Sequence, residues 1–305
     1  GGATKTVTLR GASVMSSGET NIAQDSGSNG TLNINDTSVY TSNNRLQVGP
    51  ATGSAGDVVI SGSGSMIVNA YVSVGYNGGG SMTVKDNATL SNNDDFSVNE
   101  NGAAPATVTL QDNGSISAAG VVFVGRGAGR VGTLTQTGGT FTGSGNEFQI
   151  GKFGQGTWLQ SGGVTNAGGW VSIGRETSGT GVLTVSGTGS FIQTGTDRGL
   201  VVGELGSGTL NVQGTASVSC LGSTGVIVAN GGTGVGVVNL DGGTLQSVRI
   251  ADGGGNGTFN FNGGKLLAGT GSTPTFMAGL DAAYVKSGGA NIDSNGETIA
   301  IDQDL

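Results

Sequence analysis

The chain has 305 residues, of which 64 are glycine, 34% are hydrophobic and 10% are charged, with 12 basic residues, 20 acidic residues and no histidine. Glycine this frequent, without the every-third-residue period of collagen, argues against helices, because an interior glycine costs a helix about 1 kcal/mol relative to alanine. The formal net charge of −8 and the lack of an apolar run long enough to cross a bilayer predict no nucleic-acid partner and no membrane insertion.

A short phrase with alternating apolar residues recurs along the whole chain. An apolar anchor is followed in most copies by Thr or Asn and then by a second apolar residue, as in TVTL at 6 and TLNV at 209. Successive anchors are 21 to 28 residues apart, and they are Val7, Leu32, Val58, Met82, Val108, Leu134, Trp158, Leu183, Leu210, Val238, Phe259 and, much degraded, Tyr284. This period of two predicts strands with one face in a core.

Two further phrases recur between the anchors. One is again a short alternating strand that ends in a small residue, as in LQVG at 46, VFVG at 122 and VIVA at 226. The other begins with a glycine corner and returns an apolar residue to the interior, as in GGTF at 138 and GGTL at 242. Each unit is therefore predicted to contain three short strands and three corners.

A unit of this size cannot bury its apolar side alone, whereas stacked units bury a continuous core and pair every strand with its copies above and below. The sequence therefore predicts an all-β chain, a single domain over residues 1–305. Its expected fold is a parallel β-solenoid, or β-helix, of about 12 coils, with about 25 residues and three short strands per coil. At roughly 4.8 Å per coil, the rod would be 55–60 Å long.

The phrases GTLTQTGGTF at 132, GTLNVQGTASV at 208 and GGANIDSNGETIAI at 288 resemble the β-strand repeats of bacterial autotransporter passenger domains and related secreted surface proteins. The resemblance covers nearly the whole chain. It implies a right-handed parallel β-helix, export to the cell surface and a structural or adhesive role.

Three polar residues interrupt the expected core. Gln136 and Gln160 fall in the interior column on consecutive coils, and buried amides need partners. We expect the two to stack as an amide ladder, with a ligand pocket as the alternative. Cys220 is the single cysteine, and its spacing from Val218 predicts a buried, inert thiol, with a reactive or intermolecular thiol as the alternative.

Catalysis on a β-helix would require paired carboxylates, bases or bound Ca²⁺ on adjacent coils. The chain has no histidine, and its only adjacent acids are Asp94 and Asp95 in the polar turn SNNDDFSV. A solvated corner is the expected role of this pair, with a Ca²⁺ or catalytic pair as the alternative. We therefore predict that the protein is not an enzyme and that it has no cofactor and no metal.

A basic column is expected on one side of the rod. Arg126, Lys152 and Arg175 each follow the corner glycine of three successive coils, with Arg130 and Arg198 nearby. Like charges one coil apart repel unless neighbouring acids or a partner compensate them. The column is interpreted as a solvated face, with lateral contact to an acidic neighbour or a glycan as the alternative.

The two ends of the repeat differ in charge, and neither shows a polar cap or an amphipathic helix. The residues assigned to the N-terminal edge are Lys5, Thr6, Val7, Thr8, Leu9 and Arg10, and those assigned to the C-terminal edge are Asp293, Glu297, Thr298, Ile299, Ile301, Asp302 and Asp304. A basic end and an acidic end suit each other, and such a head-to-tail contact does not close. We expect the strand around Thr6–Leu9 of one subunit to add onto the strand around Thr298–Ile301 of another.

The function predicted from these features is an extracellular structural subunit that assembles head to tail into a surface fibre, with itself as partner. The alternative is an autotransporter-like passenger or adhesin that binds a glycan or a matrix protein through its side surface. An adhesin should show a band of exposed aromatics, and the sequence offers scattered Tyr71, Tyr76, Phe153 and Trp170. Because the first residue is Gly rather than Met, removal of a signal sequence is expected.

Overall fold

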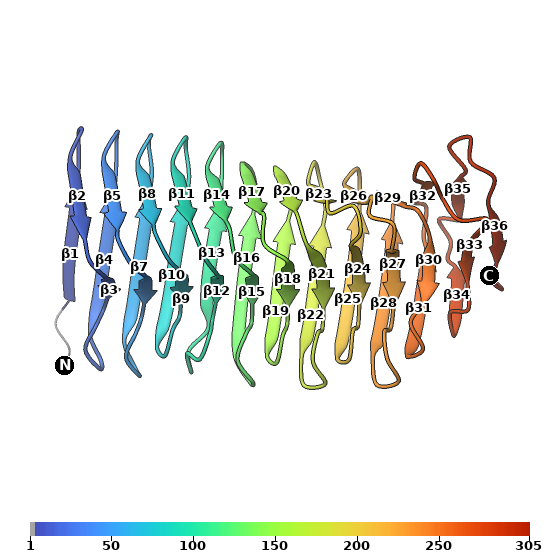
Figure 1. The fold of residues 1–305 in the computed structure, drawn as a ribbon, viewed down its shortest axis with the longest axis horizontal. Helices are drawn as coiled ribbons and strands as arrows, with labels where there is room; N and C mark the ends of the chain where they lie inside the picture. Colours follow the sequence, from blue (N-terminus) through green and yellow to red (C-terminus); the bar gives the residue numbers. More distant parts are fainter. Residues whose placement is uncertain (1–3) are drawn as a thin grey trace.

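The structure is a computed structural model that describes residues 4–305, and within that range every regular element is a β-strand (Figure 1). The strands form three parallel sheets of 12 strands each. Each sheet takes every third strand, so three consecutive strands make one coil, numbered here from coil 1 (β1 to β3) to coil 12 (β34 to β36). The predicted parallel β-solenoid of about 12 coils is confirmed.

Sheet A contains the first strand of every coil and carries the anchors. Its strands are β1 (Thr4–Leu9), β4 (Asn29–Ile34), β7 (Ala55–Ile60), β10 (Gly79–Val84), β13 (Ala106–Leu110), β16 (Val131–Gln136), β19 (Gln155–Gln160), β22 (Thr180–Val185), β25 (Ser207–Gln213), β28 (Val235–Asp241), β31 (Asn256–Phe261) and β34 (Ala282–Val285).

Sheet B contains the second strand of every coil, reached through a tight turn. Its strands are β2 (Val14–Ser17), β5 (Val39–Ser42), β8 (Ser65–Val68), β11 (Thr89–Asn92), β14 (Ser115–Ala118), β17 (Thr140–Gly143), β20 (Val164–Ala167), β23 (Ser190–Gln193), β26 (Ser217–Cys220), β29 (Thr244–Ser247), β32 (Lys265–Ala268) and β35 (Asn291–Asp293).

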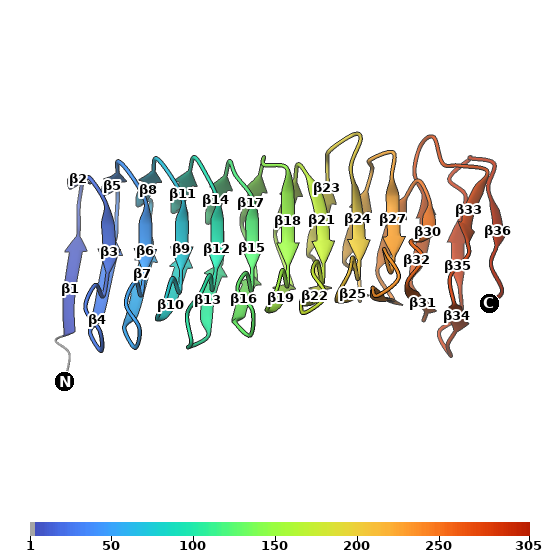
Figure 2. The same cartoon turned by 60° about the horizontal axis from the view of Figure 1, so that its bottom comes forward.

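Sheet C contains the third and mostly shortest strand of every coil. Its strands are β3 (Thr20–Ile22), β6 (Leu46–Val48), β9 (Val72–Val74), β12 (Phe96–Val98), β15 (Val122–Val124), β18 (Glu147–Ile150), β21 (Trp170–Ile173), β24 (Gly199–Val202), β27 (Gly225–Val228), β30 (Ile250–Asp252), β33 (Thr275–Ala278) and β36 (Ala300–Asp302). The three sheets run the length of the rod, as both views show (Figures 1 and 2).

The register follows the predicted anchors up to the last coil. Leu134 lies beside Trp158, and Trp158 beside Leu183, all buried. In coil 12, however, Phe259 pairs with Ala283, so Tyr284 faces outward and is 51% exposed. The prediction of Tyr284 as the last anchor is wrong by one position. The inward residue is Ala283, which is too small to stand out as an apolar anchor in the sequence.

The inward side chains of the three sheets form one continuous core along the rod. Its largest side chains cluster in coils 6 to 8, where Phe141, Phe148, Trp158 and Phe191 are all buried. The ring centroids of neighbours in this cluster are 5.0 to 6.4 Å apart. All but the tilted Phe148–Trp158 pair are edge-to-face, and such pairs add about 0.5–1.5 kcal/mol each to the gain from burial.

A column of glycines lies on the inward side of sheet A, two residues before each anchor. At Gly132 an added Cβ would lie 2.5 Å from the backbone nitrogen of Gly125, so the corner that ends sheet C packs directly against this column. Ala106 takes the position in coil 5, beside Gly132. Charged residues occupy it at the two ends, namely Lys5 in coil 1, which pairs with Gly30, and Asp281 in coil 12, whose Oδ2 accepts from the Gly257 N–H at 2.7 Å.

Candidate functional site

The N-terminal end face is formed by coil 1 and contains the six residues that the sequence assigned to this edge. Lys5 to Leu9 belong to β1, and Arg10 follows it. The inward Val7 is 49% exposed, whereas its partner Leu32 in coil 2 is 2% exposed. Met15, which pairs with the buried Tyr40, is 42% exposed. Among residues 4–305, nothing covers the apolar core at this end.

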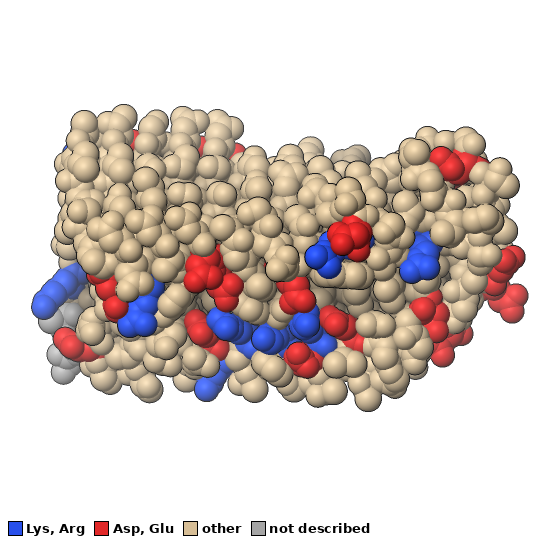
Figure 3. Space-filling model, in the orientation of Figure 1, with Lys and Arg blue, Asp and Glu red and all other residues tan. Residues whose placement is uncertain are grey.

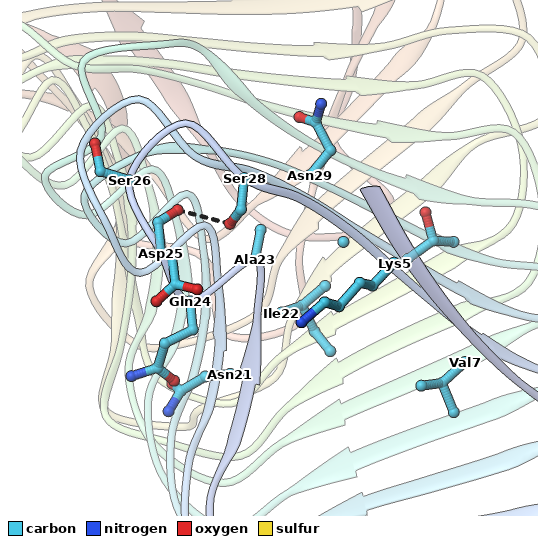
Figure 4. Close-up of a pocket in the computed structure, with 12 residues that line it drawn as sticks. Lys5, Val7, Asn21, Ile22, Ala23, Gln24, Asp25, Ser26, Ser28 and Asn29 are labelled. Carbon is cyan, nitrogen blue, oxygen red and sulfur yellow. Dashed lines mark hydrogen bonds between the residues drawn. The ribbon is translucent and has the colours of Figure 1, made fainter. Parts of the chain in front are cut away.

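A cavity of about 360 Å³ opens at the same end, between β1, β4 and the loop after β3 (Figure 4). Val7, Ile22 and Ala23 line it, and Lys5 extends across it toward Ile22. In the following coils the equivalent space is filled, because the corner that ends one coil packs against the glycine of the next. Ala23 at the end of coil 1, for example, packs against Gly30 of coil 2. The cavity is therefore the open end of the core.

The C-terminal end face lies at the opposite end of the rod and is formed by coil 12 (Figure 1). Its inward Val285 is 47% exposed, and Ile292 and Ile301 are half-buried against the core. Thr298 and Ile299 lie in the segment between β35 and β36. Apolar inward side chains are therefore exposed at both ends of the described chain.

The acids assigned to this edge divide into two groups. Asp293 accepts from Lys265 Nζ at 3.1 Å, and Glu297 accepts from the Gly271 N–H at 3.3 Å, so both bind back onto coil 11. The Asn295 N–H and then the Lys265 ammonium hold the pKa of Asp293 below its usual value. Asp302, at the end of β36, and Asp304 are exposed, and they carry the acidic character of the end.

The two predicted edge strands belong to different sheets. Thr6 to Leu9 lie in sheet A, whose last strand is β34, whereas Ala300 to Asp302 form the last strand of sheet C. A junction that continues all three sheets would therefore pair β34 with β1, β35 with β2 and β36 with β3. The predicted pairing of Thr6–Leu9 with Thr298–Ile301 does not fit this topology.

The basic column is present on the outer side of sheet C. Backbone N–H groups of Arg126, Lys152 and Arg175 bond to the carbonyls of Asn99, Gly125 and Gly151, so the three residues stack on successive corners. Space-filling Figure 3 shows charged residues gathered in a band along the rod, whereas the upper part of the same view is almost free of charge. The spacing of the corner residues was thus sufficient to find this column.

Carboxylates neutralise most of this column. Arg126 Nη1 lies 3.3 Å from Glu100 and 3.9 Å from Asp95, and Arg175 Nη1 lies 2.8 Å from Glu147 and 3.9 Å from Glu204. Burial lowers the pKa of Arg175, but the Glu147 hydrogen bond and the nearby carboxylates outweigh it and raise the pKa overall. Within the described chain, Lys152 has no carboxylate partner, and its Nζ lies 5.2 Å from the centre of the Phe123 ring.

Sequence reasoning missed the acids of this column. Glu100 and Glu204 stack on the same corners, immediately before Arg126 and after Arg175. Each directly follows the corner residue of its coil, Asn99 or Gly203, so the rule that located the basic residues could also have located these acids. Asn99 adopts φ of 57° in place of glycine, and its Nδ2 donates to the carbonyls of Ala104 and Val131 at 2.9 Å each.

The four aromatics that are scattered in the sequence, the exposed Phe153 and the half-buried Tyr71, Tyr76 and Trp170, lie on this same side. Tyr71 and Trp170 immediately precede or begin strands of sheet C and share one column, four coils apart. Tyr76 and Phe153 follow sheet C in coils 3 and 6, and Phe123 lies between Arg126 and Lys152. The aromatic rings and most of the ion pairs thus occupy one long side of the rod.

A smaller cavity, of about 220 Å³, lies within this side at coils 6 to 9. Its walls include Trp170, Arg175, Glu147 and Glu204, from three successive coils. Glu204 Oε2 accepts a short hydrogen bond from Ser172, and Glu147 Oε2 accepts one from Gln149.

The two interior glutamines are buried, as predicted, but they do not bond to each other. Gln136 Nε2 donates to the carbonyls of Gly139 and Val164, and Gln160 Nε2 donates to those of Gly163 and Ser190, at 3.0 to 3.3 Å. Thr165 Oγ1 lies between them, 2.8 Å from Gln136 Oε1 and 3.3 Å from Gln160 Oε1. The predicted amide ladder is therefore wrong, because the two amides are connected through the hydroxyl of Thr165 and not directly to each other.

Cys220 is fully buried, and burial raises the pKa of its thiol to about 12. Asp94 is exposed, while Asp95 Oδ1 accepts from the Val121 N–H at 2.9 Å. In residues 4–305, no three His, Cys, Asp or Glu side chains come together as metal ligands. The same residues include no helix with the length and apolar character of a membrane span.

Comparison with protein families, with curated proteins and with solved structures finds no match to this chain.

Proposed function

We propose that this protein is an extracellular structural subunit that stacks end to end, through coils 1 and 12, into a fibre. The observation that carries the proposal is the exposure of inward apolar residues at both ends, Val7, Met15 and Val285, in columns that are otherwise apolar or hydrogen-bonded and mostly buried. A location outside the cell is part of the same proposal, and its support is the resemblance to passenger-domain repeats.

The register between coils suggests how two copies would meet. If each sheet continued across the junction, Val7 would stack on Ala283, Leu9 on Val285 and Met15 on Ile292 of the next copy. The strand edges of β1 and β34, which pair with one neighbour each among the described residues, would then complete their ladders. Such a contact joins two different surfaces, so it propagates and does not close.

Charge supports the same register. Lys5 and Asp281 occupy the glycine column in coils 1 and 12, and continued stacking would bring them side by side. The exposed Asp302 and Asp304 add negative charge at the acidic end, while Arg10 adds positive charge at the other. Opposite charges one coil apart favour a head-to-tail contact over a head-to-head one.

The test compares two lysine substitutions at the same end. Val7→Lys places a charge on the inward column and should abolish assembly, whereas Val14→Lys, on the outward side of β2, should leave it unchanged. Sedimentation velocity and electron microscopy at increasing protein concentration would measure assembly. A parent protein that stays monomeric at high concentration, or a Val7→Lys variant that assembles like the parent, would contradict the proposal.

A charge exchange tests the register itself. Lys5→Glu should prevent assembly, and adding Asp281→Lys should restore part of it, because the pair is reversed. Lys85→Glu, which makes the same charge change at a corner far from both ends, is the matched control. Equal assembly of Lys5→Glu and Lys85→Glu would show that Lys5 does not lie at the junction.

A further inference from the structure

The outer side of sheet C differs from the outer sides of the other two sheets. Its central column contains Gln47, Ser73, Ser97, Phe123, Gln149, Ser172 and Val201, all at most 4% exposed although they point away from the core. Larger side chains on the two flanking columns cover them. We call this three-column surface, from coil 2 to coil 8, the sheet C strip.

One flank of the strip carries Arg45, Tyr71, Asp95, Val121, Glu147 and Trp170, which precede or begin the strands of sheet C in coils 2 to 7. The other flank carries residues that follow the corners, which are Tyr76, Glu100, Arg126, Lys152, Arg175 and Glu204. Aromatic rings on these three columns lie in coils 3, 5 and 7, and Phe153, which follows Lys152 and whose ring centre lies 5.1 Å from Lys152 Nζ, adds one in coil 6. Together they extend over roughly 20 Å of the rod at the spacing of stacked strands.

The charges of the strip nearly cancel. Arg45 pairs with Glu19 at 3.0 Å, and the other two arginines pair with carboxylates of adjacent coils. With Lys152 the strip contains four basic residues and four acidic ones, Asp95, Glu100, Glu147 and Glu204, so it has no positive field to attract a polyanion. The complementary partner is an uncharged one.

The paired groups keep hydrogen-bonding capacity. Glu147 and Glu204 use Oε2 for their contacts with Arg175, and nothing in the described chain donates to their Oε1 atoms. Gln149 is 4% exposed, and its Oε1 has no hydrogen-bond partner within residues 4–305. The hydroxyl oxygens of Ser73 and Ser97, in the same central column, are also buried without partners there.

We propose that the sheet C strip binds a neutral polysaccharide chain that lies along the rod, with one sugar ring seated over Trp170 in the 220 Å³ cavity. A sugar ring presents an apolar C–H face, which packs on an aromatic ring, and hydroxyl groups, which donate to carboxylates and accept from guanidinium groups. The cavity is smaller than the ~300–1,000 Å³ sites that hold whole drug-sized ligands, which fits one ring of a longer chain.

Affinity electrophoresis tests this proposal with defined probes. The purified chain is run in native gels that contain galactomannan, xyloglucan or mixed-linkage β-glucan, in a gel with polygalacturonate as the acidic polysaccharide, and in a gel without polysaccharide. We expect retardation in at least one neutral gel. Fibre formation would slow the protein in every gel alike, so the gel without polysaccharide separates binding from assembly.

Two variants and one control locate the site. Trp170→Ala and Phe153→Ala should each weaken the retardation, by about tenfold in apparent affinity for Trp170→Ala, as expected when a central aromatic contact is removed. Tyr284→Ala removes an exposed aromatic from sheet A in coil 12 and should leave binding unchanged. Circular dichroism of each variant verifies folding.

Three results would overturn the proposal. The first is a parent protein that no neutral polysaccharide retards. The second is retardation by polygalacturonate alone, which would indicate a polyanion as ligand. The third is a folded Trp170→Ala and a folded Phe153→Ala that bind as tightly as the parent, which would place the ligand elsewhere on the rod.

Discussion

Thr165 occupies an inward position between Phe141 and Phe191 of the neighbouring coils, and its hydroxyl joins two buried amides. The amide nitrogens of Gln136 and Gln160 already bond to backbone carbonyls, and the two amide oxygens share the single proton of this hydroxyl. A buried acceptor that loses its donor retains the full desolvation penalty. The threonine is therefore needed for the two glutamines to be tolerated in the core.

Replacing Thr165 with Val tests this arrangement, because the side chain keeps its shape and loses its donor. We expect the free energy of unfolding to fall by about 1–3 kcal/mol. Thr135→Val, on the outward side of sheet A, is the matched control and should change the free energy by less than about 0.5 kcal/mol. Urea unfolding followed by circular dichroism measures both. Equal effects of the two substitutions would show that the hydroxyl bridge does not stabilise the core.

Cys220 gives a prediction on pH dependence. Because burial raises the pKa of the folded thiol to about 12, above its value in the unfolded chain, folding favours the protonated form. The resulting stabilisation is complete below about pH 8.5 and falls by about 1.4 kcal/mol per pH unit as the pH rises toward 12. Cys220→Ala lacks this contribution.

The free energy of unfolding of both proteins should therefore be compared between pH 8 and 10.5. The difference between them should shrink with rising pH, while alkylation of the native thiol stays slow across the same range. A constant difference, or rapid alkylation of the folded protein at pH 8, would contradict a buried thiol.

Among the structural elements, the strands of sheet A depend on the glycine column. At Gly208 an added Cβ would lie 2.2 Å from both the backbone nitrogen of Gly203 and the carbonyl oxygen of Ile173. Both atoms are backbone, so the coil has to shift as a whole to make room. The glycines are thus required by the close approach between sheet A and the preceding corner.

Gly208→Ala should destabilise coils 8 and 9 by about 1–3 kcal/mol or more, the usual effect of overpacking. Gly232→Ala, in an open loop where an added Cβ meets nothing within 4 Å, is the matched control. Thermal unfolding and limited proteolysis between coils 8 and 9 measure the effect. If Gly208→Ala melts with the control, the column has more room than the structure indicates.

Strand order and most of the register could be predicted from sequence, because alternation of apolar and polar residues fixes which side of a strand faces the core. The prediction of the register failed in coil 12, where this alternation is weak. Ala283 is too small to be recognised as an anchor, so the neighbouring Tyr284 was assigned instead. The edge pairing of Thr6–Leu9 with Thr298–Ile301 stays a prediction; because β1 and β36 belong to different sheets, it would require a junction that does not continue the three sheets.

The candidate binding surface was harder to predict than the fold. Arg126, Lys152 and Arg175 were found because each follows a corner glycine, which marks the column. Tyr71 and Trp170 share a column although they are four coils apart, and coils of 21 to 28 residues prevent such columns from being counted along the sequence. The bridging role of Thr165 depends on side-chain contacts between coils, which no linear pattern displays.

At the scale of the whole molecule, each coil contacts only its neighbours, so stability is the sum of coil and interface contributions. Because the largest buried aromatic side chains lie in coils 6 to 8, we expect the middle to be the most stable part. Coil 12 has short strands, few buried residues and a register shift between β33 and β36. Opening is therefore expected to begin at the ends.

Hydrogen exchange measured by mass spectrometry tests this order and the proposed junction together. In dilute monomer, amides of β1 and of β34 to β36 should exchange fastest, and those of coils 6 to 8 slowest, because local opening needs less free energy where fewer apolar contacts are lost. In assembled protein, the exchange of β1 and β34 should slow toward that of the middle coils, since stacking would cover both edges. The Val7→Lys variant should keep the fast exchange of the monomer at every concentration. Fibres in which β1 and β34 exchange as fast as in the monomer would show that the copies meet through another surface, of which the sheet C strip is the first to examine.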